Sequence, residues 1–207
     1  MTETDPLPLI LASASPRRRE LVAALGMSCE FASADIEEDK IPYKTPRELA
    51  IKTAYAKACE VEKRYGRGLV IAADTIVVLD GKVYMKPTDA ADACRMLGEL
   101  SGRAHTVISG VAVKEVGKGT LLDAVETVVH IRAMEAPEIA EYVATGEPLD
   151  KAGAYAVQGL GREIVSRIDG DYFNVVGLPL TRLFEMMEDF TDVSEWRERI
   201  KDLESFN

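Results

Sequence analysis

Two glycine-rich segments in the C-terminal half combine ionisable side chains with bare backbone, the combination that a ligand site needs. They are GEPLDKAGAYAVQGLG at residues 146–161 and GDYFNVVGLPL at residues 170–180. Glycine lets the main chain approach a ligand closely or adopt a positive φ, and polar residues between the glycines can then point at that ligand. The alternative is a pair of surface loops. The residues that favour a site are Glu147, Asp150, Lys151, Gln158 and Asp171.

A second candidate is the run of arginines Arg17, Arg18 and Arg19, which follows a Ser-Pro pair. Serine is a favourable N-cap and proline suits the first helical position, so the arginines fall on the first turn of a predicted helix. Cations there oppose the helix dipole. A bound anion would remove this conflict, because free N–H groups and arginines would both face it. The pattern favours an anion site; the alternative is three solvated arginines, partly paired with Glu20.

The third candidate is Asp74, which interrupts the apolar run LVIAADTIVVL at residues 69–79. Such a run predicts a buried strand, where an ionised carboxylate is costly unless it is paired or bound to a metal. A purely structural aspartate is the alternative. The position therefore predicts a charged partner or a metal ion beside Asp74.

The elements around these candidates alternate between strand and helix patterns. The predicted strands occupy residues 8–12, 69–79, 105–116, 121–133 and 163–168. The predicted helices occupy residues 15–26, 45–64, 88–100, 137–144 and 178–188. Because both βα units and a long hairpin are present, we expect a mixed sheet, with ligand residues where strand ends and loops meet.

The tail at residues 190–207 predicts one more helix, an amphipathic one docked on the body of the protein or on a second subunit. Its apolar residues recur at helical spacing: Val193, Trp196, Ile200, Leu203 and Phe206.

Composition limits the classes of partner. The chain of 207 residues is 47% hydrophobic and 29% charged, as in globular proteins that form one domain or two small lobes. The net charge of −10 argues against broad binding to nucleic acid or anionic membranes, but not against a small polyphosphate in a local cationic pocket. No membrane span or signal peptide is expected. Three scattered cysteines indicate reduced thiols and hence a cytoplasmic location.

Six blocks, in one order along the chain, resemble the Maf family. They are SASPRRRELVAALG (13–26), AADT (72–75), the Lys-Pro pair (86–87), SGRAHTVISGVAV (101–113) and the two glycine-rich segments. The resemblance implies a single Maf-like domain over residues 1–207 with an α/β fold like that of inosine triphosphatase. That fold is a mixed, elongated sheet with flanking helices and two lobes around a cleft. The resemblance further implies a homodimer that cleaves a nucleoside triphosphate between its α- and β-phosphates, with Mg²⁺ or Mn²⁺ as cofactor.

The resemblance also assigns roles to individual residues. Phosphoryl transfer of this kind depends on positioning, charge neutralisation, a metal ion and an activated water. The implied catalytic residues are Asp74, as proton acceptor, with Lys57 and Lys86. Asp74 and Glu37 are the implied metal ligands, although Glu37 could equally belong to a solvated acidic loop. The implied substrate-binding residues are Ser13, Arg17, Arg18, Thr75, Arg103, His105, Lys151 and Gln158. Of these, His105 could instead be a core histidine.

The Maf family has one branch that acts on dTTP and UTP and another that acts on 7-methyl-GTP. The first resembles AGAYGIQG, and this chain has AGAYAVQG with Gln158, where the second branch tends to have glutamate. A glutamine amide offers a donor and an acceptor, which suits the O4 and N3 edge of uracil or thymine. Arg18 and Thr75 occupy the other positions tied to base choice, and Ser109 stands where threonine is common.

The predicted function is therefore a dTTP and UTP pyrophosphatase that clears the nucleotide pool. Modified pyrimidine nucleotides are further candidate substrates, and cell-division arrest is a candidate consequence. The alternatives are a 7-methyl-GTP pyrophosphatase and a non-catalytic nucleotide-binding regulator of septum formation.

Overall fold

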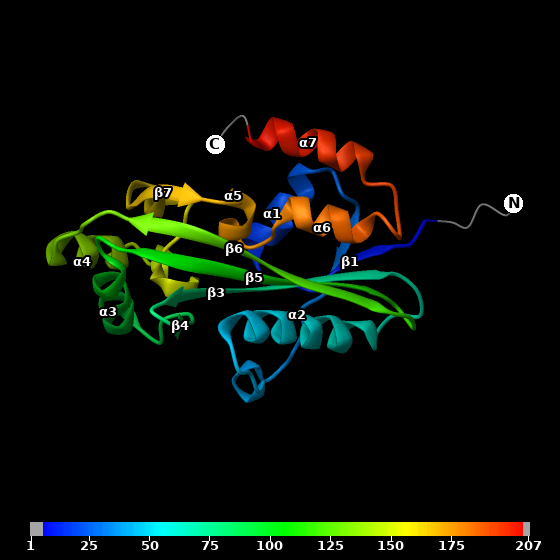
Figure 1. Cartoon of the computed structure of the whole chain (residues 1–207), viewed down its shortest axis with the longest axis horizontal. Helices are drawn as coiled ribbons and strands as arrows, with labels where there is room; N and C mark the ends of the chain where they lie inside the picture. The colour runs from blue at the N-terminus through cyan, green and yellow to red at the C-terminus, as the bar shows by residue number, and fades with distance from the viewer. Residues whose placement is uncertain (1–5, 205–207) are drawn as a thin grey trace, which may run out of the picture.

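The apolar run at residues 69–79 forms the central strand of a mixed sheet (Figure 1). The computed structural model describes residues 6–204. Its strands are β1 (Leu9–Leu11), β2 (Cys29–Phe31), β3 (Leu69–Leu79), β4 (Lys82–Tyr84), β5 (Ala104–Glu115), β6 (Thr120–Ile131) and β7 (Val165–Asp169). Their order across the sheet is β2-β1-β3-β5-β6-β7, with β4 also paired to β3. Because β1 pairs in parallel with β2 and β3 while the other pairs are antiparallel, the predicted mixed sheet is confirmed.

β3 is paired incompletely along one of its two edges. β5 occupies one edge along nearly the whole strand, so β1 and β4 share the other. β1 pairs with β3 as far as Ile71, and β4 pairs with it from Val77 onward. Residues 72–76 therefore face an opening between β1 and β4, here termed the sheet gap. Asp74 and Thr75 lie in this gap.

Helices cover both faces of the sheet (Figure 1). They are α1 (Pro16–Ala24), α2 (Pro46–Glu62), α3 (Ala90–Leu100), α4 (Ala136–Ala144), α5 (Tyr172–Val176), α6 (Leu180–Met187) and α7 (Ser194–Glu204). α2 packs on β3 and β5, whereas α1, α6 and α7 lie on the other side of the sheet. Short 3₁₀ turns occupy the loops: η1 (Glu38–Lys40), η2 (Glu147–Asp150), η3 (Ala152–Ala154) and η4 (Gly159–Glu163). None of the helices within residues 6–204 has the length and apolarity needed to cross a membrane.

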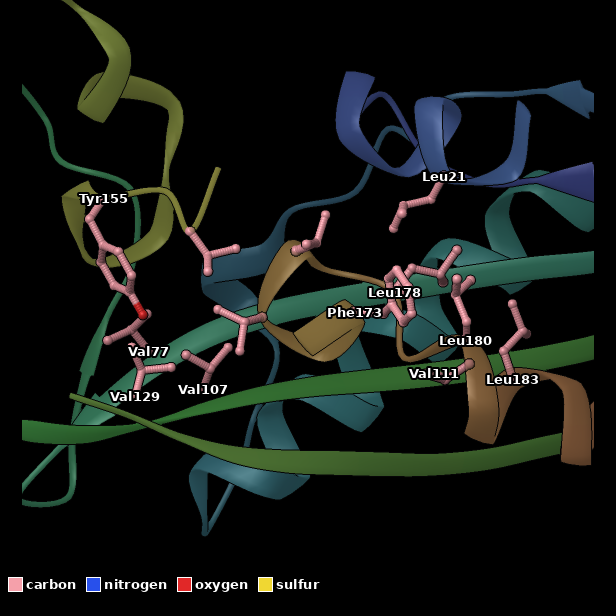
Figure 2. Packing of buried hydrophobic residues seen from close by; sticks show 14 of the residues in the cluster. Leu21, Val77, Val107, Val111, Val129, Tyr155, Phe173, Leu178, Leu180 and Leu183 are labelled. Carbon is pink, nitrogen blue, oxygen red and sulfur yellow. The ribbon is translucent and has the colours of Figure 1, made fainter. Parts of the chain in front are cut away.

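The largest hydrophobic cluster lies on the sheet face opposite α2 (Figure 2). Leu21 of α1 and Leu183 of α6 pack over Val111 of β5 at one end of this cluster. At the other end, Tyr155 stands against Val77. Burial of each such side chain contributes about 1.5–3 kcal/mol to the stability of the fold. The cluster therefore stabilises the packing of the helices on this face of the sheet.

α2 approaches the sheet most closely at Gly110 of β5. A Cβ atom on Gly110 would overlap the backbone of Ala50 and lie 2.6 Å from the Ile51 nitrogen. The helix backbone therefore rests directly on the strand. This contact sets how far the side chains of α2 reach toward β3.

Most of the predicted elements are confirmed, with small differences at their ends. α3 begins at Ala90 and not at residue 88, because the Asp89 side chain accepts the Asp92 N–H and caps the helix there. The sequence interpretation missed β2, β4 and α5, which have only 3, 3 and 5 residues and are too short for a periodic pattern.

The tail forms α7 within the predicted range and packs on the body of the protein. The Trp196 ring lies 5.9 Å from the ring of Phe184, and Val193 and Ile200 are buried. Phe206, the last residue of the predicted apolar series, lies outside the described residues.

Candidate active site

A cavity of about 520 Å³ opens beside the sheet gap. It forms there because β1 ends at Leu11 and the chain turns into α1, which leaves the edge of β3 uncovered. The cavity is lined by segments from both halves of the sequence. Its charged lining residues are Arg17, Arg18, Glu38, Lys57, Asp74, Lys86 and Asp150.

Lys57 of α2 is at the centre of the charged side of this cavity. Its Nζ donates to Asp74 Oδ1 at 2.7 Å and lies 2.8 Å from Glu38 Oε1. The Asp74 side chain is only 8% exposed, so this pair replaces much of the hydration that the carboxylate loses. Asp74 Oδ2, however, is buried without a hydrogen-bond partner. An orphaned buried oxygen is costly, and this atom is therefore free to accept a bond from a water or to bind a metal ion.

The N-terminal end of α1 forms a second charged wall. Its first turn carries no acidic residue, and the Ser15 side chain makes no capping hydrogen bond. Residues of this turn, including Arg17, line the cavity. Burial lowers the pKa of Arg17, and nearby Asp150 opposes that shift. An anion here would meet free backbone N–H groups and a partly desolvated guanidinium, with Lys86 as a further cation on the cavity wall.

The other side of the cavity is apolar. Side chains alternate along a strand, so Asp74 faces α2 while Thr75 and Val77 face the main core. Val107, Val157 and Tyr155 extend this wall. A largely apolar wall with few polar groups suits a flat, uncharged ring. The cavity thus has one end for negative charge and one end for an aromatic ring.

Arg18 lies between these two ends and is buried, with uncharged oxygens as its hydrogen-bond acceptors. Its Nε donates to Gly177 O at 2.6 Å, and its Nη2 donates to Thr75 Oγ1 at 3.0 Å. Its Nη1 donates to Ser13 Oγ at 3.3 Å. Burial lowers the pKa of Arg18, and the charge of Asp74 opposes that shift. The three hydrogen bonds hold the guanidinium in one orientation at the cavity wall.

Glu147 holds the first glycine-rich segment together. It accepts hydrogen bonds from the Tyr142 hydroxyl at 2.8 Å, from Leu160 N at 3.1 Å and from Gly161 N at 2.8 Å. Burial favours the neutral acid, but these donors prevail and the pKa of Glu147 is lowered. The geometry gives this acidic residue a structural role in the loop.

His105 ties the same segment to β5. Its Nε2 lies 2.7 Å from the Tyr155 hydroxyl, and its side chain is buried. Burial lowers the pKa of His105 to about 4, with a smaller effect from His130. His105 therefore holds Tyr155, a cavity-lining residue, without lining the cavity itself.

The structure brings seven of the predicted site residues together and leaves five outside the cavity wall. The seven that line it are Ser13, Arg17, Arg18, Lys57, Asp74, Thr75 and Lys86. The five that do not are Glu37, Arg103, His105, Lys151 and Gln158.

Each outlying residue has another partner. The Glu37 side chain is 73% exposed and pairs with Lys40. Arg103 pairs with Asp80 at 2.6 Å. Lys151 pairs with Asp150, which does line the cavity. Gln158 hydrogen-bonds with Tyr172.

The sequence interpretation missed two polar residues of the site. Glu38, and not the predicted metal ligand Glu37, lies beside Lys57; in a loop of consecutive carboxylates, no periodicity indicates which one turns inward. Ser109 is fully buried behind Thr75, to which its hydroxyl hydrogen-bonds at 2.7 Å. Its place opposite Thr75 follows from the β3–β5 register, which the sequence does not show.

The oxygen ligands at the charged end fit a divalent cation. Mg²⁺ is usually held by one or two carboxylates together with substrate phosphates. Asp74 Oδ2 and the Glu38 carboxylate are ligands of this kind. Across residues 6–204, no three His, Cys, Asp or Glu side chains gather into a complete protein site. The site therefore fits an ion that takes part of its ligands from a bound phosphate.

The chain matches a family model and is similar in sequence to several known proteins. A family model described as Maf-like protein matches residues 8–190. A dTTP/UTP pyrophosphatase of Gloeobacter violaceus is 48% identical over 182 residues, covering 88% of this chain and 95% of that protein. A dTTP/UTP pyrophosphatase of Syntrophomonas wolfei is 46% identical over 178 residues, covering 86% and 94%.

Solved structures with a similar chain path include Ham1 proteins. The Staphylococcus aureus Ham1 protein aligns with a TM-score of 0.47 at 15% identity, covering 96% of this chain and 97% of that one. A HAM1 protein from Coxiella burnetii aligns with a TM-score of 0.45 at 15% identity, covering 97% and 100%.

Proposed function

The chain belongs to the Maf family, and we propose that it is a nucleoside triphosphate pyrophosphatase that hydrolyses dTTP and UTP. The products are the nucleoside monophosphate and pyrophosphate, which requires cleavage between the α- and β-phosphates. Support for the substrate comes from the relatives named dTTP/UTP pyrophosphatase, which match this chain at 45–48% identity over most of its length. Support for the chemistry comes from the cavity.

The two ends of the cavity match the two ends of such a substrate. A triphosphate carries about four negative charges, and hydrolysis requires these to be neutralised and held in line. Arg17, Lys57 and Lys86 supply cations at the charged end, together with the free N–H groups of α1. The valine side chains and the Tyr155 ring form the apolar wall for the base.

The observation that carries the proposal is the unpartnered oxygen of Asp74. Oδ2 is buried at the cavity and free to accept the proton of an attacking water, while Oδ1 is fixed by Lys57 at 2.7 Å. A general base needs this combination of a fixed orientation and a free lone pair. Lys57 holds the carboxylate in one orientation, and Arg17 and Lys86 stabilise the charge on the leaving pyrophosphate. A bound Mg²⁺ or Mn²⁺, held by Asp74 and Glu38, would add further charge neutralisation on the phosphates.

The test is a panel of nucleoside triphosphates with Mg²⁺ or Mn²⁺, in which pyrophosphate and orthophosphate are measured separately. We expect dTTP and UTP to yield monophosphate and pyrophosphate. Release of orthophosphate would overturn the α–β cleavage, and a strong preference for 7-methyl-GTP would overturn the choice of base. Nucleotide binding without turnover would instead identify a regulator. A homodimer and a cytoplasmic location are also part of the proposal, and size-exclusion chromatography with light scattering tests the dimer.

A further inference from the structure

We propose that Ser109 fixes the hydroxyl of Thr75 as a hydrogen-bond acceptor, and that the cavity thereby selects uracil and thymine over cytosine. The inference rests on the proposed function and adds to it a positioning residue, Ser109, that does not line the cavity. It is carried by a chain of hydrogen bonds behind the cavity wall.

The chain runs from a side-chain cation to a backbone carbonyl. Arg18 Nη2 donates to Thr75 Oγ1 at 3.0 Å. Thr75 Oγ1 lies 2.7 Å from Ser109 Oγ, and Ser109 Oγ donates to the Asn174 carbonyl at 3.1 Å. Thr75 and Ser109 are direct cross-strand partners on β3 and β5, so the contact between their hydroxyls is built into the sheet register.

The direction of each hydrogen bond follows from the chemistry at the two ends. A guanidinium can only donate, and a carbonyl can only accept. Ser109 donates its single hydroxyl hydrogen to Asn174 O. The hydrogen between the two hydroxyls must therefore come from Thr75. The other acceptor within reach of Thr75 is Gly177 O, at 3.4 Å, which already accepts Arg18 Nε at 2.6 Å. The short bond to Ser109 is therefore the favoured place for the Thr75 hydrogen.

Ser109 is held so that this direction cannot easily reverse. Its side chain has no solvent exposure, and the residue that accepts its hydrogen, Asn174, is also fully buried. The Asn174 amide donates to Val107 O at 3.1 Å and to Thr127 Oγ1 at 2.9 Å. Reversal would leave a buried carbonyl without this donor, which is unfavourable.

Thr75 therefore offers a ligand only a lone pair, while the adjacent Arg18 offers only N–H groups. Both line the cavity where its apolar wall meets its charged end. In this proposal the N3 edge of the base lies against this pair, with the ribose and phosphates directed to the charged end of the cavity. Uracil and thymine carry N3–H beside a carbonyl oxygen, which matches an acceptor beside a donor. Cytosine carries a lone pair at N3, which would face the lone pair of Thr75.

The test compares kcat/KM for UTP and CTP in the wild-type enzyme and in Ser109→Ala. In the variant, the Thr75 hydroxyl is free to rotate and can donate to N3 of cytosine. We expect the UTP:CTP ratio of kcat/KM to fall by about tenfold. Ser109→Thr keeps a hydroxyl and should restore the ratio.

Thr127→Val is the matched control. It removes another buried hydroxyl from the same network, one that contacts Asn174 and Asp171 but neither Thr75 nor the cavity. It should lower stability without changing the UTP:CTP ratio. An equal loss on both nucleotides in Ser109→Ala would make Ser109 merely structural and overturn the inference, as would a wild-type enzyme that does not distinguish UTP from CTP.

Binding measurements separate this inference from the proposed function. Calorimetry with UMP and CMP reports base selection even if neither triphosphate is hydrolysed. Loss of turnover alone would therefore contradict the proposed pyrophosphatase activity but not the inference on base selection. If Ser109→Ala does not fold, Ser109→Cys replaces the hydroxyl by a weaker acceptor and should lower the UMP preference partway; an unchanged preference would overturn the inference.

Discussion

Replacing Asp74 with asparagine tests the proposed mechanism with little disturbance to the structure. The amide keeps the shape of the carboxylate, and its oxygen can still accept the hydrogen bond from Lys57 at 2.7 Å. Glu38 remains 2.8 Å from Lys57 Nζ, so the ammonium retains one carboxylate. What the substitution removes is one negative charge and the proton affinity of Oδ2, the buried oxygen without a partner.

The effects on rate and on stability should therefore separate. Loss of a general base lowers kcat by about 10²- to 10⁴-fold, which corresponds to about 3–5 kcal/mol in the activation barrier. The folded state loses part of a buried ion pair but no longer has to desolvate a carboxylate that is 8% exposed. These terms oppose each other, so we expect the free energy of unfolding to change by about 1 kcal/mol or less.

The assay is pyrophosphate release from UTP at saturating Mg²⁺, combined with urea unfolding of the same preparation. The control is Asp123→Asn on β6, because Asp123 pairs with Arg47 and Arg182 away from the cavity. That variant should keep its kcat. An Asp74→Asn enzyme that folds normally and retains more than about a tenth of the wild-type kcat would refute the role of Asp74 as proton acceptor.

Three further substitutions test how the site is held in place. Gly110→Ala forces a methyl group into the backbone of Ala50, so urea unfolding should show a loss of about 2–3 kcal/mol, and kcat should fall as α2 moves. Glu147→Gln removes the charge that accepts the Gly161 N–H; limited proteolysis should show faster cleavage at residues 159–161, and KM for UTP should rise. Because the pKa of Glu147 is lowered from 4.5, its contribution to stability is present above about pH 4.5 and lost as the pH falls further. Burial lowers the pKa of His105 from 6.5 to about 4, so the unfolded chain binds a proton that the folded protein excludes between these values. Stability should fall by about 2 kcal/mol from pH 7.5 to pH 5 for this reason, and His105→Gln should remove that part of the pH dependence.

The parts of the site that could be predicted from sequence are those that conflict with simple folding rules. Asp74 stands out because a carboxylate in an apolar strand needs a partner, and the structure supplies Lys57. The arginines at the start of α1 stand out because their charge opposes the helix dipole, and two of them line the cavity. Each conflict is local, so one stretch of sequence is enough to reveal it.

The parts that could not be predicted depend on register and on the direction of side chains in loops. Glu37 and Glu38 are chemically alike neighbours, and only the path of the loop turns Glu38 toward Lys57. Ser109 differs in sequence only by standing where threonine is common, and it becomes part of the site through its pairing with Thr75 across β3 and β5. Gln158 remains a predicted base-reading residue, which in this structure bonds to Tyr172 and does not line the cavity.

The sheet gap links occupancy of the cavity to the stability of the central strand. A central strand with both edges paired normally contains the amides that exchange most slowly with solvent, because they open only when the whole domain unfolds. In β3, residues 72–76 leave part of that backbone facing the cavity. A ligand seated there covers the middle of the central strand and not just a surface loop. Binding is thus coupled directly to global unfolding, and amide exchange at the centre of the sheet reports whether the cavity is filled.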